Sequence, residues 1–448
     1  MYKLFQSFFL LIFLSLSIYS DEDLILDSVM NEMEFIAFKE RVGQAVAKHP
    51  RFKSAQASLE AAFAQVKGSE SYLRPQLSVI LDSNNAISRK YADDPTNLVE
   101  RSQADHKTNV RFTINQLLYD FGATRYDISR SEALAKASRA QLSSTILELL
   151  YQSIRSYIDV ASYTNFEKVV EDSYLRHKEI KDRIKQRVDS GLSAGRELSR
   201  AEAREAEAFA KLTSVRQNLG IAISRFRIYF PEGELPTKLP MIAVSNDISI
   251  VESRNLMIQK NPDVLRANEE LLASNYKSKN AVASSRPRLD LELKKQHYNV
   301  TNETDEFDFY SGVNFQYDIY TGGRNEAYQE QTKAEERASM SDRDDLIQNL
   351  LAELKESIKN LKLIPDRLDA FRNAYLANKR SQYFALEEFK TSSAVLLDLL
   401  QTERDFLDSS ESMIETLRSS EIQKYTYLKI TGELGETFEI ILNNYEIN

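Results

Sequence analysis

The side chains that most often carry catalysis are scattered through this chain of 448 residues. Cysteine is absent, which excludes disulfides, thiolate metal sites and a cysteine nucleophile. Adjacent acids such as Glu387-Glu388 are typical of a solvated helix face rather than of a general acid–base pair. The four histidines are isolated and lack the spacing of metal ligands: His49, His106, His177 and His297. We therefore expect no catalytic residue, no metal and no cofactor, and we expect that the protein is not an enzyme.

Charge and glycine content exclude two further kinds of ligand. The formal net charge is −9 at pH 7, whereas a protein that binds nucleic acid needs a basic face. Gly322-Gly323 has the composition of a turn, and no GxxxxGK[ST] phosphate loop occurs. We expect no nucleic-acid partner.

The elements that position the remaining polar residues come from an internal duplication. The segment Tyr72–Val79 returns in degenerate form as Ser284–Leu291, shifted by 212 positions (287 − 75 = 212). Leu118–Gly122 returns as Ile319–Gly323, shifted by 201 positions (323 − 122 = 201). A period kept over more than half of a chain indicates two copies of one supersecondary unit. Each copy is predicted to run as helix, strand pair, long helix, turn and helix.

The N-terminus has the layout of a targeting segment. Lys3 precedes an apolar run from Leu4 to Ile18, and Asp21-Glu22-Asp23 follows. This is typical of a secretory signal peptide, which we assign to residues 1–20. The alternative is a membrane anchor, but the run is shorter than the roughly 20 apolar residues of a spanning helix. No later stretch is apolar enough for such a helix, so an exported chain that enters a membrane must do so as strands.

Four segments alternate apolar and polar side chains with period two. Strands of about ten residues with one apolar face are typical of a transmembrane β-barrel, although a soluble antiparallel sheet with one wet face gives the same pattern. Because about eight strands are needed to close a barrel, four membrane strands would require several copies of the chain to share one. The segments are Leu77–Asp82, Val110–Asn115, Leu289–Lys294 and Phe307–Asp318.

The helical stretches are unusually long. There is no Gly or Pro from Ala123 to Ser190, and Pro365, where we expect a local kink, is the sole such residue from Arg324 to Thr431. A helix from Ala123 to Val188 would measure on the order of 100 Å, too long for a compact domain. Shorter helices before each strand pair (about 40–73 and 251–284) and after each long helix would stack end to end to the same length.

These elements divide the chain into five parts. They are a signal peptide (1–20), a first structural repeat (21–228, with strand pair 76–120, long helix 122–188 and helix 197–228), a linker (229–250), a second structural repeat (251–430, with strand pair 288–320, long helix 324–389 and helix 398–430) and a C-terminal tail (431–448).

This duplicated order, with glycine-bearing turns between strand pair and long helix, resembles the TolC-like outer membrane efflux and secretion channels. The resemblance covers nearly the whole mature chain; its most specific marks besides the duplication are Leu73–Leu77 (LRPQL), Ser190–Ser193 followed by Glu197, and Thr391–Leu400. It implies a mixed α and β membrane protein, in which four transmembrane β-strands per chain form a shared 12-stranded β-barrel in a homotrimer. A long periplasmic α-helical (coiled-coil) barrel would continue it, in the outer membrane of a Gram-negative bacterium.

The resemblance also places a periplasmic mouth where the helix pairs turn, an adaptor docks and carboxylates ring the pore. Asp398 matches the first ring carboxylate, Gln401 stands where relatives often carry a second, and Glu197 is the repeat equivalent of Asp398. Three copies of Asp398 would attract cations, whereas the alternative role is to favour a helix start. Ala394 replaces an arginine of relatives, so we expect gate salt links to be absent or rebuilt through Arg196. The adaptor-docking candidates are Ser190, Gly191, Leu192, Ser193, Thr391, Ser392 and Ser393.

The resulting hypothesis is a passive outer membrane exit duct of a tripartite export system. Its partners would be a periplasmic adaptor (membrane fusion) protein, an inner-membrane transporter driven by ATP or protons, and outer membrane lipid. The segment Leu396–Glu403 (LLDLLQTE) resembles ducts of type I protein secretion. Two alternatives stay open: a drug or small-molecule efflux duct, and a soluble periplasmic coiled-coil scaffold.

Overall fold

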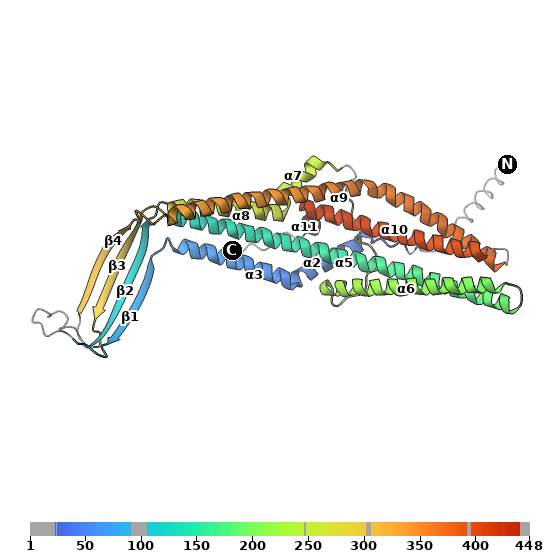
Figure 1. Cartoon of the computed structure of the whole chain (residues 1–448), viewed down its shortest axis with the longest axis horizontal. Helices are drawn as coiled ribbons and strands as arrows, with labels where there is room; N and C mark the ends of the chain where they lie inside the picture. Colours follow the sequence, from blue (N-terminus) through green and yellow to red (C-terminus); the bar gives the residue numbers. More distant parts are fainter. Residues whose placement is uncertain are drawn as a thin grey trace, which may run out of the picture. The chain divides into compact units, whose positions relative to one another are not determined.

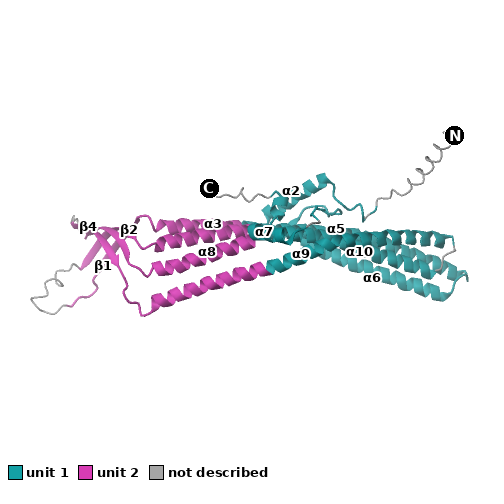
Figure 2. Cartoon of the chain, turned by 90° about the horizontal axis from the view of Figure 1, so that it is seen from above, with its two compact units in different colours: residues 1–53, 144–261, 349–446 teal, residues 54–143, 262–348, 447–448 magenta. Residues whose placement is uncertain are grey.

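A computed structural model describes residues 23, 25–90, 105–245, 248–301, 306–391 and 396–439 (Figure 1). The expected signal peptide, Ser392, Ser393, Ala394 and the tail from residue 440 lie outside the described residues. The chain divides into two compact units, coloured in Figure 2. Unit 1 comprises residues 1–53, 144–261 and 349–446, and unit 2 comprises residues 54–143, 262–348 and 447–448. Each unit therefore draws on both halves of the chain.

Unit 2 contains one antiparallel sheet. Its strands are β1 (Gln76–Asn85), β2 (His106–Tyr119), β3 (Arg288–Tyr298) and β4 (Glu306–Gln316), in the spatial order β1-β2-β3-β4 (Figure 1). Directly paired residues share a face in an antiparallel sheet, and alternate residues along a strand share it too. The pairs Leu77–Ile114 and Leu291–Val313 thus lie on one apolar face, which runs across all four strands.

The last strand is shorter than the sequence predicts. Its ladder ends at the pair Arg288–Gln316, so Tyr317 and Asp318 lie beyond the strand. Pro287, the residue just before β3, has no N–H to donate to a longer ladder. The alternation of apolar and polar residues continues through Tyr317 and Asp318, but β3 does not extend far enough to pair with them.

The helices of unit 2 adjoin the sheet. They are α8 (Pro262–Ala283), most of α3 (Pro50–Ser71) and the N-terminal parts of α5 (Ala123–Asp189) and α9 (Arg324–Lys390). Side-chain hydrogen bonds link neighbouring helices: Ser69 Oγ lies 2.8 Å from Ser131 Oγ, and Lys277 Nζ lies 2.6 Å from Glu335 Oε2.

The expected leading helices are not continuous. The helix α2 (Glu32–Lys48) ends before Pro50, and α7 (Ile250–Lys260) ends before Pro262. His49 and Asn261 adopt extended backbone conformations, with ψ values of 135° and 120°. A proline disfavours the helical conformation at the residue before it and lacks an N–H itself, which favours the break seen in each of these two predicted helices.

The long helices α5 and α9 each have 67 residues. At 1.5 Å per residue each would span about 100 Å. The helix α9 runs through Pro365 without a break in its assignment. The following helices, α6 (Gly195–Tyr229) and α10 (Leu396–Thr431), begin two residues before the predicted starts at Glu197 and Asp398.

Unit 1 is held together by the middle of α5 and by an aromatic cluster. Phe38 of α2 packs 4.7 Å from Tyr157 of α5, and Phe226 of α6 packs 4.7 Å from Phe230, measured between ring centroids. The segment after α6 lies against this core, since Tyr425 of α10 donates to the Pro240 carbonyl at 2.9 Å. The fully buried aliphatic residues in the middle of α5 include Ile146, Leu149, Leu150, Ile154 and Ile158.

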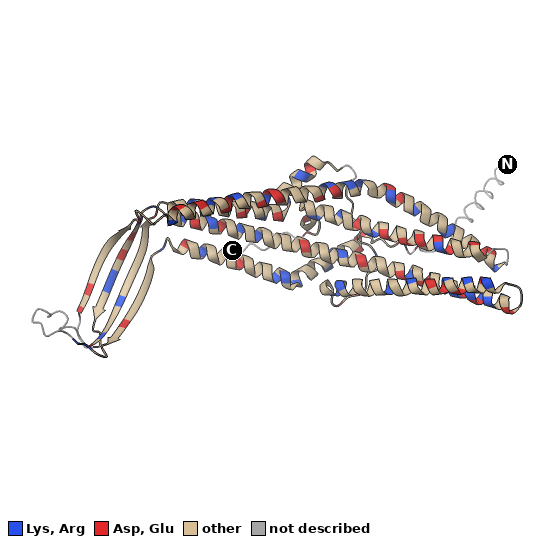
Figure 3. Cartoon of the chain, viewed as in Figure 1, with Lys and Arg blue, Asp and Glu red and all other residues tan. Residues whose placement is uncertain are grey.

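Basic and acidic side chains are interspersed along the helices (Figure 3). Over the described ranges, no helix combines the length and the apolar character needed to cross a membrane. The short helix α11 (Leu434–Thr437) follows α10 and buries Leu434.

Candidate pore-end site at the helix turns

The two helix pairs α5–α6 and α9–α10 share one hydrophobic cluster next to their turns. Val188 and Leu386 are half-buried against it, as is Leu198 at the start of α6. The structure therefore brings together the two turns that the sequence singles out. The buried members are Ile180, Ile184, Ala385, Phe389, Leu396, Leu399 and Leu400.

The first turn is closed by Gly191. Its φ angle of +71° is in the left-handed region, which glycine adopts without steric cost. The N–H of Leu192 donates to Arg187 O at 2.8 Å, and that of Gly191 donates to Val188 O at 2.9 Å, which is the hydrogen-bond pattern of a Schellman motif. The Leu192 side chain is 73% exposed.

Glu197 stabilises the start of α6. Its carboxylate accepts a hydrogen bond from the Ser193 hydroxyl, and its N–H donates to Ala194 O at 2.9 Å. A carboxylate in the first turn also interacts favourably with the helix dipole. The structure thus gives Glu197 a local role, while the neighbouring Arg196 is exposed.

The second turn precedes α10. Thr391 is exposed at its start, and the docking candidates Ser392 and Ser393 fall outside the described residues. Asp398 lies in the first turn of α10 and is exposed, as is Gln401, whose Nε2 donates to Asp405 Oδ1 at 2.8 Å.

Asp398 and Gln401 share the exposed side of α10. Residues three apart on a helix are neighbours, so these two side chains lie on one face, away from buried Leu399 and Leu400. Among the residues that the structure describes, neither Asp398 nor Arg196 takes part in an ion pair within the chain. The Asp398 carboxylate, exposed and without an ion pair among the described residues, is free to face a pore or another copy.

A buried ion pair lies behind this face, and the sequence analysis missed it. The Glu403 side chain is fully buried, and both of its oxygens accept from Arg176 Nε at 3.1 Å. Gln382 Nε2 donates to Glu403 Oε1 at 3.0 Å. The contacts join α5, α9 and α10. The sequence does indicate that Glu403 is buried, because it follows Leu396, Leu399 and Leu400 at helical spacing and so continues their buried face.

His177, next to Arg176, is also buried. Burial lowers the pKa of its imidazole, the positive charges of Arg176 and Arg204 lower it further, and Glu403 and Glu207 act in the opposite direction. Across the described part of the chain, no group of three or more His, Cys, Asp or Glu side chains is arranged to hold a metal ion.

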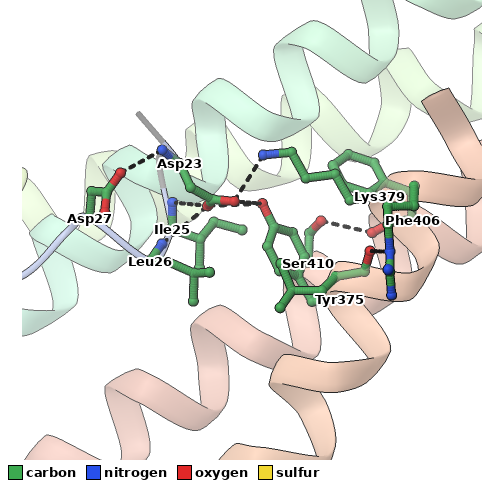
Figure 4. A network of polar contacts seen from close by, with 10 residues as sticks. Asp23, Ile25, Leu26, Asp27, Tyr375, Lys379, Phe406 and Ser410 are labelled. Carbon is green, nitrogen blue, oxygen red and sulfur yellow. Dashed lines mark hydrogen bonds and ion pairs between the residues drawn. The ribbon is translucent and has the colours of Figure 1, made fainter. Parts of the chain in front are cut away.

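The N-terminal segment is anchored on α9 (Figure 4). The Asp23 carboxylate accepts from the Tyr375 hydroxyl at 3.0 Å and from Lys379 Nζ at 2.8 Å. The backbone N–H groups of Ile25 and Leu26 donate to the same carboxylate at 3.1 Å. Burial acts to raise the pKa of Asp23, but the hydrogen bonds from Lys379 and the backbone hold it below its usual value.

With this geometry established, comparison with known proteins decides the family. The family model described as "Outer membrane efflux protein" matches residues 42–227 and 254–432, which is more than half of the chain. The chain belongs to the outer membrane efflux protein family. The resemblance to TolC-like channels is thereby confirmed, as is the location in the outer membrane with a periplasmic helical extension.

Individual members of the family are distant in sequence and close in fold. The outer membrane efflux protein BepC of Brucella suis biovar 1 (strain 1330) is 23% identical over 337 residues, 74% of each chain. The CmeC outer membrane channel of Campylobacter jejuni has a TM-score of 0.80 at 16% identity, covering 92% of this chain and 89% of that one. The MtrE outer membrane channel of Neisseria gonorrhoeae has a TM-score of 0.73 at 16% identity, covering 88% and 89%. The predicted combination of long helices with a small antiparallel sheet is therefore confirmed.

Proposed function

We propose that this outer membrane efflux protein is a passive exit duct that works as a homotrimer. The observation that carries the proposal is the strand order, which leaves one edge each of β1 and β4 without a partner within the described chain. In lipid, unpaired edge N–H and C=O groups cost several kcal/mol each. Three copies paired edge to edge satisfy them in a barrel of twelve strands, and the helices continue it as a periplasmic tube.

The duct needs partners, because nothing in the described chain supplies energy. We place the periplasmic adaptor at the turns Ser190–Ser193 and Thr391–Ser393, and the inner-membrane transporter beyond it. Support comes from the exposure of Leu192 and from the shared cluster that holds the two turns together.

The pore constriction belongs at the same end. Asp398 is the ring carboxylate and Gln401 lies beside it on the exposed face of α10, with Glu197 and Arg196 as neighbours at the other turn. The exposure of Asp398 in the first turn of α10, next to the turn, is what supports this role.

Two classes of substrate remain candidates. Small-molecule efflux is favoured by the description of the family and by the name of BepC. Type I protein secretion is favoured by the segment Leu396–Glu403, but Leu396, Leu399, Leu400 and Glu403 are all buried in contacts between helices. Packing within the chain accounts for that segment, so efflux is the better supported class.

The duct itself is tested by purification and reconstitution. The full-length protein should need detergent, elute at the size of a trimer, and open conducting pores in planar bilayers. A monomer that stays soluble without detergent would instead establish the periplasmic scaffold. A strain lacking the protein then separates the substrates: it should accumulate fluorescent dyes, whereas loss of a secreted protein with normal dye efflux would assign type I secretion.

The position of the constriction is tested by removing one negative charge from each chain. Asp398→Asn should lower the cation selectivity of the reconstituted pore severalfold, because three fixed charges leave the narrowest ring. Glu197→Gln at the equivalent position of the first repeat is the comparison variant, and it should lower selectivity by less, because that carboxylate is half-buried and is held at the start of α6 by the Ser193 hydroxyl. Unchanged selectivity in Asp398→Asn would return Asp398 to a role in starting the helix.

A further inference from the structure

One charged side chain interrupts the apolar face of the sheet. Lys295 of β3 follows Leu289, Leu291 and Leu293 at every second position. The pairing register sets it opposite Phe112 of β2 and Phe309 of β4, so it shares their face. Within the four described strands it is the only Lys, Arg, Asp or Glu on that face. The other large apolar residues of this face are Leu77, Val79, Leu81, Val110, Ile114, Phe307, Val313 and Phe315.

Lys295 lies far from the helices. All four strands join helices at one end of the sheet, the helical edge, and the hairpins β1–β2 and β3–β4 turn at the other, the hairpin edge (Figure 1). At the helical edge, Leu289 pairs with Tyr119 and Phe315. Lys295 is six residues further along β3, or about 20 Å at 3.3 Å per residue. Strands of a transmembrane barrel tilt by roughly 40°, so this length is about 15 Å along the membrane normal, and it places Lys295 in the half of an apolar band about 25 Å tall that is nearer the hairpins.

The ammonium group points toward the hairpin edge. The direct neighbour of Lys295 is Phe309, yet its Nζ lies 4.9 Å from the ring centroid of Phe307, two residues nearer the hairpin. The His297 ring, paired with Phe307, lies 5.6 Å from that ring. Lysines in membranes extend in this way to bring their charge to the headgroup level.

The opposite face of the sheet provides a contrast. Lys294 lies there, with its Nζ 5.3 Å from the Tyr310 ring centroid. Carboxylates share that polar face, and Arg111 is 3.6 Å from Asp82 there. On the apolar face, no carboxylate belongs to the described strands. A positive charge in apolar surroundings needs an anion, and here the anion must come from outside the described sheet.

We infer that Lys295 binds the phosphate of a glycolipid in the outer leaflet of the membrane, one site per copy. The inference rests on the proposed function, which sets this face in lipid with the hairpin edge outward. A phosphate gives the ammonium a charge-assisted hydrogen bond. The Phe307, Phe309 and Phe112 rings around it contact acyl chains. This combination of a cation beside aromatic rings selects an amphiphilic phosphate rather than free phosphate.

The test measures binding of bisphosphorylated lipid A to the full-length protein in detergent by native mass spectrometry. Lys295→Gln should bind roughly tenfold more weakly, the loss expected for one hydrogen bond between charged partners. Lys295→Arg should retain binding. Lys294→Gln, one residue away on the other face, is the matched control and should bind as the original does. Dephosphorylated lipid A should bind weakly to every variant, and millimolar inorganic phosphate should not compete.

Three results would overturn the site: equal binding by Lys295→Gln, equal binding of the dephosphorylated lipid, or displacement by free phosphate. Detergent sizing and bilayer conductance are recorded for each variant. Protein that neither inserts nor conducts would overturn the proposed duct, whereas normal conductance without phosphate-dependent binding would overturn only the lipid site.

Discussion

Glu403 and Glu421 show, at the scale of single residues, two ways to bury a carboxylate on α10. Both side chains are 0% exposed. Glu403 is compensated by Arg176 and by Gln382. Glu421 accepts from Lys424 Nζ at 2.6 Å and from the N–H of Ile242 at 3.2 Å, yet burial still raises its pKa.

Removing one partner of the Arg176–Glu403 pair should be costly. Arg176→Met leaves a buried carboxylate with no cation, a change worth about 3 kcal/mol or more of unfolding free energy. The double variant Arg176→Met/Glu403→Met should recover much of that loss, since no charge stays buried. Thermal unfolding followed by circular dichroism measures both. A double variant no more stable than Arg176→Met would show that the uncompensated carboxylate is not what destabilises the single variant.

His177 should make the helical region less stable in mild acid. Its folded pKa lies below the value of about 6.5 for a free imidazole, so the unfolded chain binds more protons as the pH falls through that value. The contribution of neutral His177 to the free energy of unfolding is therefore fully present above this pH range and is lost as the pH falls. His177→Gln should reduce the difference in unfolding temperature between about pH 7.5 and about pH 5.5. An undiminished difference would assign the effect to other groups.

Glycines and prolines determine where elements end. Pro50 and Pro262 break the helices before the strand pairs, and Gly191 ends α5. Gly432 has a φ of +84° directly after α10, and a Cβ added there would lie 2.6 Å from the Lys260 carbonyl carbon and oxygen. Its close contact thus joins the ends of α7 and α10 within unit 1.

Two glycine substitutions separate backbone strain from steric overlap. Gly191→Ala should cost about 1 kcal/mol, because φ is positive but no atom lies within 4 Å of the new Cβ. Gly432→Ala has the same kind of strain plus overlap with the backbone of Lys260, so its unfolding temperature should drop clearly further. Equal drops would mean that α7 and α10 can separate at little cost.

For the whole molecule, the sequence predicts the kinds of element better than their contacts. The absence of Gly and Pro predicts α5, their scarcity predicts α9, and alternation of apolar residues predicts the sheet, because these signals are local. The pair Arg176–Glu403 could not be predicted in this way, since its members are 227 positions apart. The ring role of Asp398 stays a prediction for a related reason: its partners would be other copies of the chain.

The Asp23 anchor has a consequence for the order of events in biogenesis. Asp23 is made early, whereas Tyr375 and Lys379 follow it by 352 and 356 residues. During synthesis and export, the N-terminal segment therefore has no binding site until most of the chain has emerged. Once α9 is present, closure of this contact distinguishes a chain that has reached α9 from one truncated before it, and protection of the N-terminal segment from protease would time that stage.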